Sequence, residues 1–523
     1  MVTQNKLIKG DIMSNIFNVK FGDKKYFRII FLCTFAIGLL VHFYKISNNL
    51  LNHDSLFSYY SSQNIIESGR WFLSVACAFS TWYDLPWVSG VFTILLVALT
   101  SVVVADILKI KNLSIACISG AVMVSFPPIT ETLFFGFTAD GYALAMLLSA
   151  MSVWFATRKK GKALFNNVLS IILLVLTLGI YQAYLSFALL LIICFAIKNT
   201  ASSSELYIDK KWKFIGKQVT IVAISMVLYY AIWKLLMLFQ NVSPTGYQGI
   251  NMAGFSINTI IIAPLRIIKS MLISILTRNI FRHGISIYAA LNILFILVAV
   301  CILVLYIVKN KIYKKCFDII FLIVCVVCIP FAAYFWHFTS TSVEYGPRML
   351  ASLNLAVILP LVLCDELNAI RKLKNVVLAL IVAMIINNSL IANVCYFYLQ
   401  QENDVSLSMA SEMVTRIHDL GKGNDGKMFV VGSRAKHISI DDKYDTSQIL
   451  CLSSTLDKDF LYDDTHTMAY LNNTLNCNFV SANEDEKDKI LASDKYKEMP
   501  EWPKKGSIDI INNIVVIKYP DEV

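Results

Sequence analysis

Long runs of apolar residues alternate with short polar segments along most of the chain. Most runs approach the roughly 20 residues that a helix needs to cross a bilayer, so each predicts a spanning helix. The stretch 164–198 is too long for one crossing and is interpreted as a tight hairpin around Tyr181 and Gln182. The pattern predicts eleven crossings, at about residues 27–44, 87–108, 113–131, 139–157, 164–182, 184–198, 218–239, 287–308, 317–337, 348–365 and 376–398.

Residues 257–276 are also apolar, but Pro264, Arg266 and Lys269 interrupt them. A charge at the centre of a span costs at least about 2.5 kcal/mol on insertion scales. We therefore expect an external interfacial or re-entrant helix here rather than a twelfth crossing.

From Leu399 onward the pattern changes to that of a water-soluble domain. A helical segment at 406–420 ends at Gly421, the run KMFVVGS predicts a strand, and IDIINNIVVIKY is another strand candidate. Cys451 and Cys477 form a disulfide there or remain two free thiols, because sequence supplies no geometry. The prediction is a mostly α, polytopic membrane bundle of about eleven transmembrane helices, with interfacial helices in external loops and a small C-terminal extracytoplasmic α/β domain.

Composition supports this division of the chain. The sequence is 57% hydrophobic and 16% charged, with a mean hydropathy of +0.61, which excludes an ordinary water-soluble enzyme. Residues 399–523 contain 22 acidic and 14 basic residues, a net charge of −8, so the net +10 of the whole chain leaves +18 for the apolar part. Charge of this kind is typical of membrane ends, and the expected partner is a lipid bilayer and not nucleic acid.

Lysine and arginine clusters predict the orientation. With eleven crossings the clusters at 109–111, 158–162, 198–217, 309–315 and 371–374 share one side with the N-terminal lysines. The positive-inside rule makes that side cytoplasmic. We expect a multi-pass cell-membrane protein with a cytoplasmic N-terminal segment (1–26), a transmembrane domain (27–398) and an extracytoplasmic domain (399–523).

Several basic residues map to the external side, against that rule. An anionic ligand at the outer leaflet would explain them, and snorkelling to lipid headgroups is the equally weighted alternative. A guanidinium at this surface suits a phosphate, which it can bind through two parallel hydrogen bonds. The candidates for phosphate binding are Arg70, Arg266, Lys269, Arg278, Arg282 and Arg348.

Acidic candidates lie in the first two external loops. His53 and Asp54 precede an expected interfacial helix, where the helix dipole would keep Asp54 ionised as a general base. The alternative is that Asp54 is only a helix N-cap, for which Ser55 is equally suitable. In FPPITETLFFGFTADGYALAM, Glu131 and Asp140 either bind sugar hydroxyls and assist Asp54, or are helix-end residues that face water.

These motifs resemble those of the GtrII-type membrane glucosyltransferases, which are GT-C-like enzymes that use lipid-phosphate sugars. The resemblance rests on the order of HDSL, GRW, FPPITETLFFGFTADGYALAM, GIYQAYLSF and EYGPRML over residues 25–400. It implies transfer of a hexose, glucose in this family, from a polyprenyl-phosphate donor at the outer leaflet to a surface glycan such as an O antigen or a bacterial wall polysaccharide. Asp54 is the position that matches the acidic residue that acts as catalytic base in the broader class.

The family motif often carries two adjacent acids, and here the first position is His53. This departure favours a metal-independent site without cofactors over a divalent metal held by two carboxylates. Aromatic rings could stack on sugar faces, although interface aromatics commonly serve only as membrane anchors. The candidates for substrate binding are His53, Trp71, Tyr142, Tyr181, Gln182, Trp336 and His337.

Two other functions fit an apolar chain with an external domain. A transporter or flippase of lipid-linked glycans should show internal repeats and broken helices at the midplane. We find no repeat, and the charges lie at the external edge. A non-catalytic scaffold that binds wall polymer is the third hypothesis.

Overall fold

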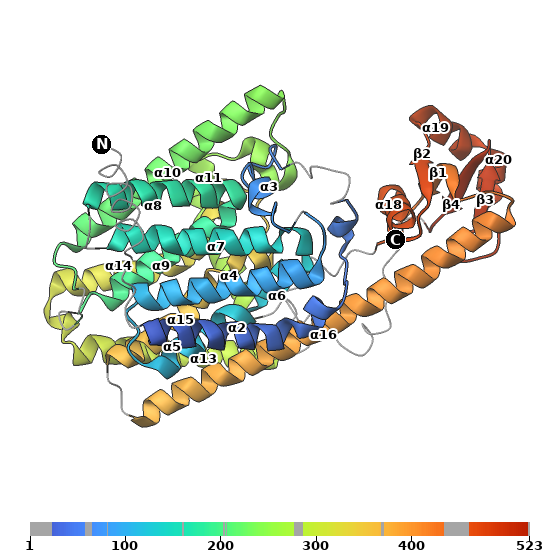
Figure 1. Cartoon of the computed structure of the whole chain (residues 1–523). Helices are drawn as coiled ribbons and strands as arrows, with labels where there is room; N and C mark the ends of the chain where they lie inside the picture. Colours follow the sequence, from blue (N-terminus) through green and yellow to red (C-terminus); the bar gives the residue numbers. More distant parts are fainter. Residues whose placement is uncertain are drawn as a thin grey trace, which may run out of the picture.

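The computed structural model describes residues 24–57, 65–80, 82–158, 162–201, 204, 207–276, 286–367, 371–433 and 460–520. Arg278, Arg282 and Cys451 lie outside these ranges, so their predicted roles are not considered further. The described chain forms a bundle of long helices, from which one helix extends to a small domain containing a β-sheet (Figure 1).

Within the described ranges, ten helices are long and apolar enough to cross a membrane, or eleven if the bent pair α5 and α6 counts as one span. The predicted membrane bundle is therefore confirmed, and the chain is a multi-pass membrane protein. The helices of the bundle are α2 (Lys24–Ser47), α3 (Leu73–Ala76), α4 (Pro86–Ile107), α5 (Leu113–Ser125), α6 (Pro127–Phe134), α7 (Gly136–Thr157), α8 (Ala163–Ile180), α9 (Leu185–Lys198), α10 (Lys211–Gln240), α11 (Ile257–Ile275), α13 (Ile287–Lys309), α14 (Cys316–Ala333), α15 (Leu353–Glu366) and α16 (Arg371–Asp419). Short 3₁₀ turns join them: η1 (His53–Phe57), η2 (Gln182–Tyr184), η3 (Tyr247–Met252), η4 (Ile312–Lys314), η5 (Phe335–Phe338) and η6 (Pro347–Leu350).

Small residues allow the helices at the centre of the bundle to approach closely. A Cβ added to Gly38 of α2 would lie 2.5 Å from a methyl of Ile94 in α4 and 2.6 Å from a methyl of Val124 in α5. Helices in lipid associate mainly through such packing, because the hydrophobic effect does not distinguish a neighbouring helix from a lipid tail.

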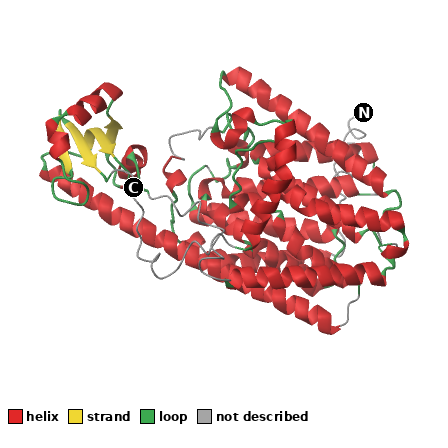
Figure 2. Ribbon diagram, turned by 180° about the vertical axis from the view of Figure 1, so that it is seen from behind, coloured by secondary structure: helices red, strands yellow, loops and turns green. Residues whose placement is uncertain are grey.

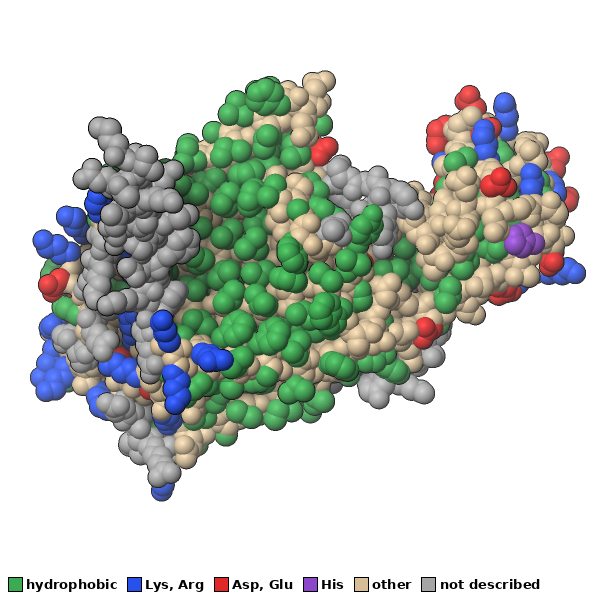
Figure 3. Space-filling view, in the orientation of Figure 1, with side chains coloured by type: hydrophobic (Ala, Val, Ile, Leu, Met, Phe, Trp, Pro, Cys, Tyr) green, Lys and Arg blue, Asp and Glu red, His purple; other side chains and the backbone are tan. Residues whose placement is uncertain are grey.

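The two ends of the bundle have different side chains. Lys and Arg gather at one end, the lysine-rich end, whereas apolar side chains cover the face between it and the sheet-containing domain (Figure 3). We call the opposite end the domain-facing end. Apart from α11, successive long helices run between these two ends in alternating directions.

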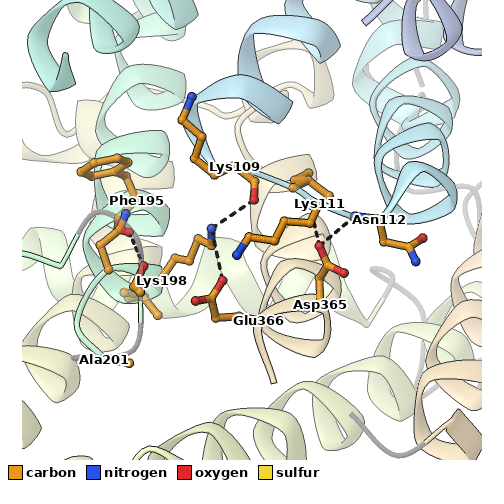
Figure 4. A network of polar contacts seen from close by, with 12 residues as sticks. Lys109, Lys111, Asn112, Phe195, Lys198, Ala201, Asp365 and Glu366 are labelled. Atoms are coloured by element: carbon orange, nitrogen blue, oxygen red, sulfur yellow. Dashed lines mark hydrogen bonds and ion pairs between the residues drawn. The ribbon is translucent and has the colours of Figure 1, made fainter. Parts of the chain in front are cut away.

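A buried ion pair and several hydrogen bonds connect the loops at the lysine-rich end (Figure 4). Lys198 lies 3.4 Å from Glu366, and both side chains are almost fully buried. The adjacent Asp365 accepts the backbone N–H groups of Lys111 at 2.8 Å and Asn112 at 3.1 Å. These contacts join the ends of α9 and α15 to the connection between α4 and α5.

Helix α11 satisfies the length and hydropathy criteria for a span, but both its ends lie at the domain-facing end. Ile275, its last residue, accepts a hydrogen bond from Asn292 in the second turn of α13. The far end of α13 is at the lysine-rich end, where the Tyr306 hydroxyl donates to the carbonyl of Lys198 at 2.6 Å. Because α10 ends and α13 begins at the same side, α11 makes no net crossing, as an interfacial or re-entrant helix would.

The segment after Pro127 and Pro128 differs from the predicted loop. It is helical almost throughout, as α6 and the first turns of α7, with a bend of 41° between α5 and α6. Glu131 and Asp140 are only 1% and 4% exposed. The interpretation of these two acids as helix-end residues facing water is therefore wrong.

The last crossing and the predicted soluble helix are one helix, α16, of 49 residues. At 1.5 Å per residue it is about 73 Å long, more than twice the roughly 30 Å of a bilayer core. Figures 1 and 2 show it leaving the bundle to support the sheet-containing domain. The domain boundary predicted at residue 399 therefore falls inside a continuous helix.

The C-terminal domain is α/β, as predicted (Figure 2). Its sheet has the order β2-β1-β4-β3, in which β1 pairs in parallel with β2 and β4. The segment IDIINNIVVIKY is an antiparallel hairpin and not one strand, because Asn512 and Asn513 adopt the positive φ angles of a tight turn. The elements are β1 (Asp425–Val431), α18 (Asp464–Thr474), β2 (Asn478–Ser481), α19 (Glu484–Ala492), α20 (Asp494–Glu498), β3 (Ile508–Ile511) and β4 (Ile514–Lys518).

Candidate functional site

A stacked pair of tyrosines lies at the domain-facing end of the bundle. The rings of Tyr142, in the second turn of α7, and Tyr181, between α8 and η2, are 4.4 Å apart with an angle of 12° between their planes. Arg70 covers this pair: its guanidinium lies 5.1 Å from the centre of the Tyr181 ring and 3.4 Å from the Tyr142 hydroxyl. The buried Nε of Arg70 has no hydrogen-bond partner among the described residues.

Arg348 supplies a second guanidinium to the same site. It lies 3.9 Å from the centre of the Phe135 ring, and it is close enough to Arg70 and Tyr181 to affect both electrostatically. Its backbone N–H donates to the carboxylate of Glu131. In the part of the chain that the structure describes, no ion pair joins either guanidinium to a carboxylate.

Three elements hold the loop that carries Arg70. Trp233 donates to the carbonyl of Ile66 at 2.6 Å, and Tyr229 donates to the carbonyl of Gly69 at 3.0 Å, both from α10. Gln182, from η2, donates to the carbonyl of Ser68 at 2.8 Å. Trp71, which follows Arg70 in the sequence, packs against the backbone of α8. A Cβ added to Gly179 of α8 would lie 2.7 Å from the ring of Trp71. Arg70 is thus positioned by residues far apart in the sequence.

The loop after α14 closes one side of this region. The indole of Trp336 donates to the carbonyl of Gln182 at 3.1 Å. His337 is 3% exposed and hydrogen-bonds through Nε2 to the hydroxyl of Ser270 in α11 at 3.0 Å. Burial, with a contribution from the charge of Arg266, lowers the pKa of His337 to about 4, so its imidazole is neutral near pH 7.

The basic residues of α11 lie in different surroundings. Arg266 donates to the carbonyls of Thr341 and Val343, which fastens α11 to the loop before η6. Lys269 is exposed. Of the predicted phosphate ligands that the structure describes, it brings together Arg70 and Arg348 and uses Arg266 in a backbone contact.

Asp54 lies in a second cluster, where η1 meets the C-terminal domain. Its carboxylate is 3.3 Å from Nε2 of His53, and 44% of the Asp54 side chain is exposed. The His53 ring lies 6.3 Å from the ring of His466 in α18, measured between centroids. Asp54 is therefore available to solvent, as a general base that meets an external acceptor must be.

Asp84 is a buried acid that was not selected from the sequence. It is 4% exposed, its Oδ2 accepts the hydroxyl of Ser55 at 2.5 Å, and its Oδ1 packs against Gly136 at the start of α7. Burial raises the pKa of Asp84, although the charge of Lys45 and the bond from Ser55 act in the opposite direction. Asp84 therefore connects the turn that carries Asp54 to the start of α7, beside Phe135 and Arg348.

Asp140 is buried inside α7 and interacts with Ser80 and Cys77. Its Oδ1 also accepts the backbone N–H of Gly141 at 3.0 Å. These contacts pin the loop between α3 and α4 to α7, so Asp140 supports the neighbouring Tyr142. No group of three or more His, Cys, Asp or Glu among the described residues is arranged to hold a metal ion.

Comparison with known proteins identifies the family of the chain. The family model described as Glucosyl transferase GtrII matches residues 43–363, which include both arginines, both tyrosines and Asp54. Comparison with curated proteins and with solved structures gives no match. The match covers more than half of the chain and all but the first and last crossings of the bundle. The chain therefore belongs to the GtrII glucosyl transferase family and is a membrane glycosyltransferase.

Proposed function

We propose that this glucosyltransferase takes glucose from a polyprenyl-phosphate donor and transfers it to a surface polysaccharide at the outer leaflet. The carrying observation is the pair Arg70 and Arg348 at the domain-facing end of the bundle, where the nearby carboxylate of Glu131 offsets only part of the charge of two guanidiniums and no ion pair of either is found among the described residues. Two cations inside a membrane protein need an anionic ligand, and the phosphate of a lipid-linked sugar reaches this depth.

The positive-inside rule supports the orientation. The lysine-rich end is then cytoplasmic, and the domain-facing end with the C-terminal domain is extracytoplasmic. A polyprenyl chain can remain in the bilayer while its phosphate reaches Arg70 and Arg348 at the outer edge. Trp71 and Trp336, which are partly buried beside this site, are suited to contact the sugar.

In the proposed reaction an acceptor hydroxyl attacks C1 of the glucosyl group. The bond between C1 and the phosphate oxygen breaks, and polyprenyl phosphate departs with the electron pair and an additional negative charge. Arg70 and Arg348 stabilise that charge. The carboxylate of Asp54 accepts the proton of the attacking hydroxyl.

Glu131, Asp140 and Asp84 support this chemistry by holding other residues of the site in position. Glu131 fixes the backbone of Arg348, Asp140 braces α7 under Tyr142, and Asp84 anchors the turn of Asp54 through Ser55. We propose no cofactor, because His53 replaces the second acid that a two-carboxylate metal site would use.

The test is transfer of radiolabelled glucose from synthetic polyprenyl-phosphate glucose by the full-length protein in nanodiscs. The acceptor is surface polysaccharide extracted from a host that lacks the gene. Asp54→Asn should reduce transfer at least about 100-fold, since general base catalysis contributes 10²- to 10⁴-fold, and EDTA should have no effect. Arg158→Lys at the lysine-rich end is the control.

Full transfer by Asp54→Asn would reject Asp54 as the base. Loss of transfer in EDTA that Mg²⁺ or Mn²⁺ restores would reject the metal-independent reaction. Movement of the labelled donor across the membrane without a new glycosidic bond would instead indicate a flippase.

A further inference from the structure

The C-terminal domain is attached to the bundle at the turn that carries Asp54. Leu56, in η1, is 1% exposed and packs in the hydrophobic core of the C-terminal domain. Asn473, at the end of α18, donates to the carbonyl of Leu56 at 2.7 Å. The domain and η1 therefore form one packed unit, although they are about 400 residues apart in the sequence.

Aromatic and polar side chains from both partners meet at this contact. We define the junction cluster as His53 and Asp54 of η1 with Tyr462, Asp463 and His466 at the start of α18. The ring centroids of Tyr462 and His466 lie 4.3 Å apart, and that of His53 lies 6.3 Å from that of His466. The cluster places two aromatic faces of the C-terminal domain beside the proposed base.

The side of the cluster formed by the C-terminal domain is held in place by the cap of α18. Oδ1 of Asp463 accepts the backbone N–H of His466 at 2.7 Å and lies 2.8 Å from Nδ1 of the same residue. Burial and then the neighbouring carboxylates of Asp463 and Asp54 raise the pKa of Tyr462 to about 12, so its hydroxyl keeps its proton. The ring positions are thus defined before any ligand binds.

The chemistry of the cluster fits a sugar. Rings of Tyr and His offer a face to the C–H groups of a pyranose, whereas carboxylates accept hydrogen bonds from its hydroxyls. The side chains of Asp54 and Asp463 are 44% and 38% exposed, so both can reach a ligand. Because residues 399–523 carry a net charge of −8, an anionic ligand would be repelled.

We infer that the junction cluster binds an uncharged, hydroxyl-rich saccharide segment of the acceptor and presents its hydroxyl to Asp54. The C-terminal domain is then the acceptor-binding part of the enzyme. This rests on the proposed function, because it takes Asp54 as the base and a glycan as the acceptor. The three residues that the domain contributes lie beyond residue 363, where the family match ends, so this recognition belongs to the C-terminal extension of the chain.

The experiment measures glycan binding and transfer separately, with the full-length protein in nanodiscs. Binding to immobilised polysaccharide from a host that lacks the gene is followed by surface plasmon resonance, and transfer uses synthetic polyprenyl-phosphate glucose. Tyr462→Ala and His466→Ala should each weaken binding about tenfold, the loss expected from about 1.4 kcal/mol of stacking. The KM for glycan should rise by a similar factor, with no matching rise in the KM for donor.

Two variants serve as controls. Tyr462→Phe keeps the ring and should retain most of the binding, which separates loss of stacking from loss of folding. His418→Ala removes an exposed histidine of the same domain that lies near the start of β1, whereas the junction cluster lies near the end of this strand. This variant should bind glycan as the wild type does. Size-exclusion profiles and melting temperatures of the variants report on folding.

Wild-type binding by both alanine variants would overturn the inference, whether or not transfer occurs. Loss of binding in these variants supports it even if the wild type fails to use polyprenyl-phosphate glucose, in which case the donor assignment fails instead. An alanine variant that binds glycan normally but loses transfer would also reject acceptor binding at this cluster.

Discussion

The carboxylate of Glu131 accepts the backbone N–H of Arg348, a residue 217 positions later in the chain. This contact joins α6, behind the paired prolines, to η6, which begins at Pro347. It holds the backbone of Arg348, which carries one of the two guanidiniums proposed to bind phosphate. Glu131 thus acts on the site through Arg348.

Replacement of Glu131 distinguishes this positioning role from direct catalysis. Glu131→Gln keeps an oxygen that can accept the N–H, so kcat/KM for donor should fall less than about fivefold. Glu131→Ala leaves the buried N–H without a partner, which costs about 1–3 kcal/mol and should reduce kcat/KM about 10- to 100-fold. A Gln variant as inactive as the Ala variant would indicate that Glu131 itself exchanges a proton.

Replacement of Arg348 by lysine tests the phosphate site. Lysine keeps the charge but loses the planar fork of donors, so KM for polyprenyl-phosphate glucose should rise about tenfold or more. The matched control is Arg158→Lys, because Arg158 also lies over an aromatic ring, 4.1 Å from that of Trp154, but at the lysine-rich end. Equal KM values for the two variants would contradict phosphate binding by Arg348.

Ser55→Ala tests whether Asp84 anchors the turn that carries Asp54. The variant removes the hydroxyl that donates to Asp84, and loss of about 1 kcal/mol of positioning should lower kcat about fivefold. Binding of donor should be unaffected. Ser47→Ala is the control, because it removes an exposed hydroxyl that donates to carbonyls of α2 and accepts only from the adjacent Asn48. An unchanged kcat for Ser55→Ala would show that η1 needs no such anchor.

The ion pair of Lys198 and Glu366 should matter for stability and not for transfer. Glu366→Gln removes the carboxylate that faces the buried ammonium of Lys198, and breaking a buried ion pair typically costs about 3–5 kcal/mol, so the melting temperature in detergent should fall. The double variant Lys198→Met with Glu366→Leu removes both charges and should recover most of the loss. If Glu366→Gln has the same melting temperature as the wild type, the ion pair contributes nothing to the stability of the fold.

The neutral His337 predicts a loss of stability in acid. Its folded pKa of about 4 is below the unfolded value near 6.5, so between these values the unfolded chain binds more protons. Stability should fall as pH decreases from 6.5 to 4, by up to about 3 kcal/mol. Melting temperatures of the wild type and of His337→Gln across this pH range check the prediction, because the Gln variant should lose less stability. Parallel curves would reject a buried neutral imidazole.

Most of the fold could be predicted because each apolar run and each basic cluster indicates its own position in the membrane without reference to distant residues. Each of the eleven predicted crossings corresponds to helices of the bundle, and α11, which Pro264, Arg266 and Lys269 interrupt, has both its ends at the domain-facing end. The errors occurred where polar residues are buried by neighbours. Glu131 and Asp140 looked like loop acids because sequence does not show that η6 and α3 cover them.

The sequence alone determined that the chain is a multi-pass membrane protein with a soluble C-terminal domain, and its motifs indicated the glycosyltransferase family. These properties depend on solvent preference and on the order of residues along the chain. Only the tertiary structure decided that Arg70 and Arg348 share one site, that Asp84 supports the turn of Asp54, and that Tyr462 and His466 reach that turn. Such contacts join residues tens to hundreds of positions apart, and packing of the helices sets them.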